Sequence, residues 1–111
     1  MNDVTICWVV TSEIEAKIVA HELELSRVLG ETKYMVFADH SQTIWLIVSG
    51  FGQTNTAEAT NYLYRLSNAP KWALWVHLGF AFSSKEKRGE TFIVDKIIQS
   101  STGFVFYTGV I

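Results

Sequence analysis

The amino-acid sequence predicts an α/β domain with a mixed β-sheet and flanking helices. Three observations lead to this prediction. Short apolar runs rich in β-branched residues recur along the chain, two segments between them have helical periodicity, and glycine, proline or polar clusters separate the runs. The length of 111 residues suits a single domain, 1–111, with one modest core.

The first strand and the first helix follow each other directly. Residues 4–10 (VTICWVV) form a nearly continuous apolar run, which is typical of a strand buried on both faces. Ser12 and Glu15 then make the S-x-x-E pattern of a capping box at a helix start, and Gly30 is a natural stop. The helical period predicts one buried stripe, which consists of Ile14, Ile18, Leu25, Val28 and Leu29.

A hairpin and a second helix come next. Residues 32–38 and 43–49 are two strand-like runs, and the four polar residues between them predict a hairpin loop. A helix is expected to begin near Thr54 or Asn55 and to run to about Ser67, because the residue before Pro70 avoids the helical region.

Three further strands complete the prediction. They are residues 72–82, 91–98 and 104–107, separated by polar or glycine-containing turns. The predicted order is therefore β-α-β-β-α-β-β-β, which indicates a mixed sheet.

Composition excludes several classes of function. Nine Lys and Arg against eleven Asp and Glu give a net charge of −2, which argues against nucleic acid as a partner. A lone Cys7 allows no disulfide framework, and three histidines without ligand spacing predict no metal site and no cofactor. No signal-peptide pattern and no run near the ~20 apolar residues of a membrane span is visible, so a cytoplasmic protein without membrane contact is expected.

The first candidate for chemistry is a carboxylate at the start of the first helix. Glu13 and Glu15 lie just past the end of the first strand, at the edge where α/β sheets bind ligands. Such a carboxylate could orient a water molecule or contact a substrate hydroxyl. Alternatively, Glu15 is the second half of the capping box and Glu13 favours the positive helix end.

The second candidate is the glycine-containing turn Gly50-Phe51-Gly52, between a strand and a helix. Free backbone N–H groups at the helix start could hold an anion there. The segment lacks the third glycine of a dinucleotide fingerprint and the lysine of a P-loop, so a tight turn is the simpler interpretation. His77, close to Gly79 in an apolar strand, could contact a ligand or could be structural.

The order of the motifs resembles a known superfamily. The chain reads TSEIEAK at 11–17, VSGFGQTNTAEA at 48–59, WVHLGFAF at 75–82 and RGETFIVDK at 88–96. In sequence and spacing it resembles the nucleoside phosphorylase and nucleosidase superfamily, and most of all the methylthioadenosine/S-adenosylhomocysteine nucleosidases. The resemblance extends over nearly the whole chain and covers the N-terminal half of a typical member, which implies a partial nucleoside phosphorylase-like fold.

The resemblance implies cleavage of the N-glycosidic bond of a purine nucleoside. Glu15 would be the glutamate that contacts water or ribose. The ribose or phosphate side would be lined by Ser49, Gly50, Phe51 and Gly52, and the base side by His77, Gly79, Phe80, Ala81 and Phe82. His77 and Phe80 stand where phosphorylases tend to have Arg and Ser for phosphate, which favours hydrolysis over phosphorolysis.

The resemblance also implies that some catalytic groups are absent from these residues. No Met-Glu ribose segment and no aspartate for protonating the purine is present, so the 111 residues alone are expected not to turn over nucleosides. The alternative is a non-catalytic nucleoside-binding or assembly domain of the same fold, which the apolar Phe80 and Phe82 favour. The aromatic-rich composition and the apolar ending Val110-Ile111 lead us to expect a homo-oligomer or a missing C-terminal half.

Overall fold

The computed structural model describes residues 3–30, 32–79, 96–98 and 105–107. The chain divides into two units, 1–81 and 82–111. The first unit has a five-stranded mixed sheet and two helices, which confirms the predicted α/β class.

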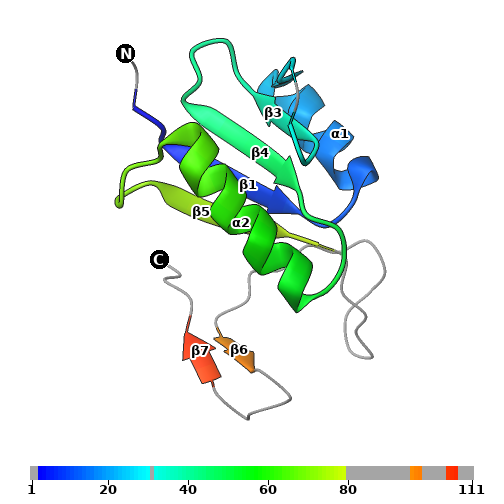
Figure 1. Cartoon of the computed structure of the whole chain (residues 1–111), viewed down its shortest axis with the longest axis vertical. Helices are drawn as coiled ribbons and strands as arrows, with labels where there is room; N and C mark the ends of the chain where they lie inside the picture. Colours follow the sequence, from blue (N-terminus) through cyan, green and yellow to red (C-terminus); the bar gives the residue numbers. More distant parts are fainter. Residues whose placement is uncertain (1–2, 31, 80–95, 99–104, 108–111) are drawn as a thin grey trace. The chain divides into compact units, whose positions relative to one another are not determined.

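The elements follow the predicted order with one addition (Figure 1). The first unit consists of β1 (Ile6–Val10), α1 (Glu13–Leu23), β2 (Ser26–Arg27), β3 (Val36–Ala38), β4 (Ile44–Val48), α2 (Gln53–Ser67) and β5 (Leu74–Leu78). The second unit has β6 (Lys96–Ile98) and β7 (Val105–Tyr107), which pair antiparallel. The added element is β2, whose two exposed polar residues give no apolar signal in the sequence.

The sheet of the first unit has the strand order β2-β3-β4-β1-β5. β1 is parallel to both β4 and β5, whereas β3 is antiparallel to β4 and to β2. The last residue of β1, Val10, is aligned with Val48 of β4 and with Leu78 of β5. The carboxyl ends of three parallel strands therefore meet at one edge of the sheet.

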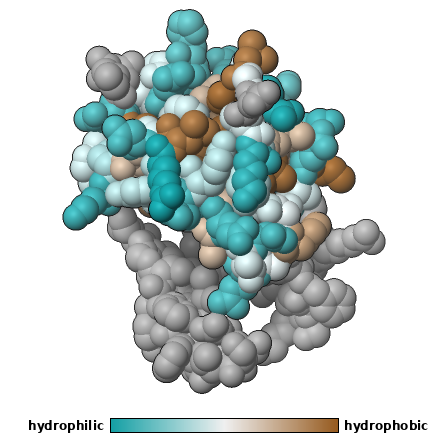
Figure 2. All heavy atoms as spheres, in the orientation of Figure 1, coloured by the Kyte–Doolittle hydropathy of each residue, from teal (hydrophilic) through white to brown (hydrophobic). Residues whose placement is uncertain are grey.

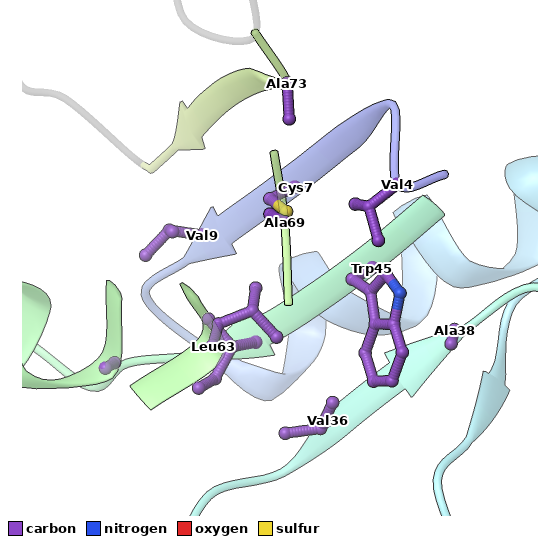
Figure 3. Packing of buried hydrophobic residues seen from close by; sticks show 11 residues of the cluster. Val4, Cys7, Val9, Val36, Ala38, Trp45, Leu63, Ala69 and Ala73 are labelled. Carbon is purple, nitrogen blue, oxygen red and sulfur yellow. The ribbon is translucent and has the colours of Figure 1, made fainter. Parts of the chain in front are cut away.

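The two helices cover opposite faces of this sheet, as Figure 1 shows for α2 in front and α1 behind. Cys7 and Val9 of β1 pack on the α2 side, whereas Val10 packs on the α1 side. Figure 3 shows Leu63 of α2 among the buried residues on this side of the sheet, which include Val36 and Trp45. Since β1 and β4 are neighbours whose following helices lie on opposite faces, the sheet has a switch point between their carboxyl ends.

The stripe predicted for the first helix is wrong as a helix face, although Leu25 is buried and Val28 packs against the core after the helix has ended. α1 ends at Leu23, and Glu24 takes a left-handed conformation with a φ of 56°. The residues that α1 buries are Glu15, Ala16, Val19 and Ala20. Ile14, Ile18 and Leu29 are instead 67%, 59% and 91% exposed. The physical reason is that small alanines let the helix lie close to the sheet, and the chain leaves the helix early to form β2.

The predicted hairpin is confirmed, and one carboxylate organises its loop. Asp39 accepts hydrogen bonds from the backbone N–H of Thr43 at 2.8 Å and of Ile44 at 3.1 Å. The hydroxyls of Ser41 and Thr43 donate to its other oxygen. Desolvation alone would raise the pKa of Asp39, but these hydrogen bonds outweigh it and lower the pKa below its usual 3.8.

The second helix agrees closely with the sequence. α2 runs from Gln53 to Ser67, and Asn68 ends it in a left-handed conformation. Polar and charged side chains cover most of the face seen in Figure 2, with apolar residues between them. Within the described ranges, neither helix combines the length and the apolar character needed to cross a membrane.

Candidate functional site

The structure gathers the predicted site residues that it describes at the carboxyl edge of the parallel strands. Ser49 follows β4, and its backbone N–H donates to the carbonyl of Val10 in β1 at 2.8 Å. Gly79 follows β5, and a Cβ on it would lie 3.4 Å from Cγ2 of Thr11. Glu15 stands in the first turn of α1, after β1. Phe80, Ala81 and Phe82 lie outside the described residues.

Glu15 is the chemically distinctive residue of this edge. Its side chain is buried, with the residue only 3% exposed. One carboxylate oxygen, Oε1, accepts hydrogen bonds from the hydroxyls of Thr11 at 2.6 Å and Ser12 at 2.8 Å. The other oxygen, Oε2, is buried and has no hydrogen-bond partner among the described residues. An unpaired buried acceptor costs about 1–3 kcal/mol, and a ligand that donates to Oε2 would remove this cost.

The structure shows one of the two hydrogen bonds of a capping box at Ser12 and Glu15. Ser12 is the N-cap, and its hydroxyl oxygen accepts from the backbone N–H of Glu15 at 3.5 Å. In a full capping box the glutamate would accept from the backbone N–H of the N-cap residue. Here its carboxylate takes the two hydroxyl hydrogen bonds instead. The neighbouring Glu13 is exposed and pairs with Lys17 at 3.4 Å, so it does not contribute to the site.

The glycine-containing turn after β4 is held by hydrogen bonds of its own chain. Gly50 and Gly52 have φ values of 81° and 99°, which side chains rarely allow. The hydroxyl of Ser49 donates to the carbonyl of Gly50 at 2.7 Å, and the amide of Asn55 donates to the carbonyl of Phe51 at 2.7 Å. This geometry agrees with the tight-turn interpretation of the segment.

The start of α2 differs from that of α1, because it has no side-chain cap. Gly52 occupies the N-cap position, and no side chain accepts a hydrogen bond from the first turn. Phe51 beside it is 70% exposed. A bare helix start next to Ser49 leaves backbone donors close to the carboxyl edge.

Of the third candidate segment, 77–82, the structure describes residues 77–79. His77 lies on β5 opposite Val9 and is exposed, which does not suit a buried structural histidine. Its Nε2 lies 4.0 Å from the position that a Cβ on Gly79 would take, and Thr11 contacts the same position. His77 and Thr11 therefore both lie beside Gly79 at this edge.

Two surface grooves of the described residues lie elsewhere. One runs along α2 and is lined by Lys33, Tyr34, Glu58, Asn61, Tyr62, Arg65 and Leu66. A second is lined by Ala57, Thr60, Asn61, Tyr64 and Trp75. Neither groove includes a residue of the carboxyl edge. Among the described residues, no three His, Cys, Asp or Glu side chains come together as metal ligands would.

Thr11 is the residue of this edge that sequence reasoning missed. The available signal is a second hydroxyl residue directly before the N-cap, within the segment T-S-x-x-E.

No protein-family model, no curated protein and no solved structure matches this chain.

Proposed function

We propose that this chain binds a purine nucleoside at the carboxyl edge of β1, β4 and β5, as part of a nucleosidase-like site that hydrolyses the N-glycosidic bond. In this proposal Glu15 positions the attacking water or a ribose hydroxyl. The Ser49–Gly52 turn lines the sugar side, and the segment that begins at His77 and Gly79 lines the base side. The motif order of the sequence supports the choice of ligand class.

The observation that carries the proposal is the buried carboxylate of Glu15 with one oxygen left unpaired by the described residues. Hydrolysis of a glycosidic bond needs an acceptor that orients water and takes up its proton. A carboxylate oxygen meets that need, and its place at a sheet switch point is where α/β proteins bind ligands. A glutamate kept only for the helix start would gain nothing from a buried, unpaired oxygen.

We do not expect these 111 residues alone to cleave the nucleoside. Cleavage requires a group that protonates the departing purine, and the sequence has no residue that the superfamily resemblance assigns to that step. Binding and chemistry are therefore separable in this chain, and binding is the property to measure first.

The test is calorimetric titration of the chain with methylthioadenosine, combined with an assay for adenine release. Glu15→Gln keeps the shape and removes the charge, so it is expected to weaken binding about tenfold. Glu13→Gln is the matched control, because Glu13 lies in the same helical turn but is exposed and bound to Lys17. It is expected to change affinity by less than about twofold.

Three outcomes decide among the interpretations. Binding that depends on Glu15 and not on Glu13, without adenine release, supports the proposal. Binding that is unaffected by Glu15→Gln favours the non-catalytic alternative. Adenine release by the unmodified chain, abolished in Glu15→Gln, would keep the reaction class and overturn the claim that these residues alone are inactive.

A further inference from the structure

Two hydroxyl groups hold the same oxygen of Glu15. Thr11 Oγ1 lies 2.6 Å and Ser12 Oγ 2.8 Å from Oε1, and both hydroxyls donate to it. Hydrogen bonds from a hydroxyl to a carboxylate are charge-assisted, and the 2.6 Å bond from Thr11 has the short length of a strong one. They fix the rotation of the carboxylate and make its two oxygens different. Oε1 is occupied, whereas Oε2 is left without a partner among the described residues.

The two hydroxyls do not have the same set of tasks. Ser12 is also the N-cap of α1, so its loss would disturb the helix start. Thr11 precedes the cap, and the only hydrogen bond described for its hydroxyl is the one to Glu15. Its methyl group Cγ2 lies 3.4 Å from the Cβ position of Gly79 after β5. A β-branched side chain has restricted rotation, and the rotation that Thr11 adopts directs its hydroxyl to the carboxylate.

The geometry points to Thr11 as a positioning residue: together with Ser12 it holds Oε1 of Glu15, so that Oε2 is presented as the single acceptor for a hydroxyl or water donor. This inference rests on the proposed function for the identity of the ligand, but not for the positioning itself. Thr11 acts through Glu15 and is not required to touch the ligand.

The first arm of the test needs no ligand. The carbon-13 signal of the Glu15 carboxyl group is identified by its absence in Glu15→Gln and is then compared between variants. Thr11→Val keeps the shape and removes the hydroxyl, so this signal is expected to shift or broaden as the carboxylate loses a donor. Thr11→Ser keeps the hydroxyl and is expected to restore the signal. An unchanged signal in Thr11→Val overturns the inference, whatever the ligand.

The second arm measures affinity for methylthioadenosine. Thr11→Val is expected to weaken binding about tenfold, and Thr11→Ser to bind within about twofold of the unmodified chain. Thr60→Val is the matched control, because the Thr60 hydroxyl donates to the carbonyl of Thr56 within α2 and to no other group of the described residues. Its affinity is expected to stay within about twofold, and its melting temperature shows how much a Thr→Val change alone disturbs the fold.

A double-mutant cycle separates positioning from general support. If Thr11 acts through Glu15, Thr11→Val in the Glu15→Gln background adds no further loss of affinity. Full additivity of the two losses overturns the inference. If the unmodified chain does not bind the nucleoside but the carboxyl signal responds to Thr11→Val, the proposed function fails while the positioning role stands.

Discussion

The two faces of the main sheet bury different kinds of side chain. On the α2 side, Leu63 inserts into a cluster of apolar sheet residues that includes Cys7 and Trp45 (Figure 3). On the α1 side, the helix meets the sheet through small residues such as Ala16, and it also buries the carboxylate of Glu15. Both sides therefore bury a large apolar side chain, Leu63 on the α2 side and Leu46 on the α1 side, and the α1 side also holds a charge.

Under the proposed function, this difference separates stability from chemistry within a small fold. A large apolar side chain in a close-packed cluster contributes to folding through its buried area. A buried carboxylate with an unpaired oxygen opposes folding, and such groups persist in proteins mainly where they bind or react. The α2 helix is therefore expected to contribute more to stability than α1, and under the proposed function the α1 side carries the chemistry.

The largest expected effect is on the α2 side. Leu63→Ala removes a side chain that is fully buried and leaves a cavity, so it is expected to lower the free energy of unfolding by about 3 kcal/mol. Leu66→Ala on the same helix is the control, because Leu66 is 40% exposed and is expected to lose less than about 1 kcal/mol. Urea unfolding followed by circular dichroism measures both. Equal losses would contradict the assignment of α2 as the main anchor.

A moderate effect is expected from Cys7 at alkaline pH. Burial raises the pKa of the Cys7 thiol from 9.0 to about 11, against a smaller opposite effect of the Ser67 hydroxyl. Between these values the unfolded thiol loses its proton while the folded one keeps it, so deprotonation favours unfolding. Stability is therefore complete below pH 9 and falls as the pH rises toward 11, by at most about 1.4 kcal/mol per pH unit.

Cys7→Ala isolates this effect from other groups that titrate in the same range. Urea unfolding of both proteins at several pH values between 8 and 11 gives two curves, and their difference belongs to the thiol. The difference is expected to shrink with rising pH, because only the unmodified chain loses stability through Cys7. Parallel curves would show that the pKa of the Cys7 thiol is not raised by folding.

Much of the fold follows from local patterns in the sequence. β1 is an apolar run, and its alternate residues face two packed helices. α2 is bounded by a glycine and an Asn-Ala-Pro segment, so its limits were predicted within one or two residues. The gathering of Glu15, Ser49 and Gly79 at one edge follows from parallel strand order, because residues after parallel strands share an edge.

Two features could not be predicted, for identifiable physical reasons. A helical period shows which residues share a stripe, but not which side of the helix the sheet covers. In α1 the sheet covers the alanine side, since Ala16 and Ala20 allow close approach. The T-S-x-x-E segment places a hydroxyl residue before the N-cap, but the hydrogen bond from Thr11 to Glu15 depends on side-chain rotation at Thr11, which the spacing alone does not specify.

The smallest expected effect tests this orientation of α1 directly. Ile18 is 59% exposed, so Ile18→Gln is expected to change the free energy of unfolding by less than about 0.5 kcal/mol. Its neighbour Val19 is 8% exposed, and Val19→Gln is expected to lose about 2–3 kcal/mol, because a polar amide would enter the apolar cluster. A large loss in Ile18→Gln, measured by urea unfolding, would mean that another surface covers this side of α1 in solution. The buried face of α1 would then extend beyond the residues around Glu15, and the contrast between the two sides of the sheet would weaken.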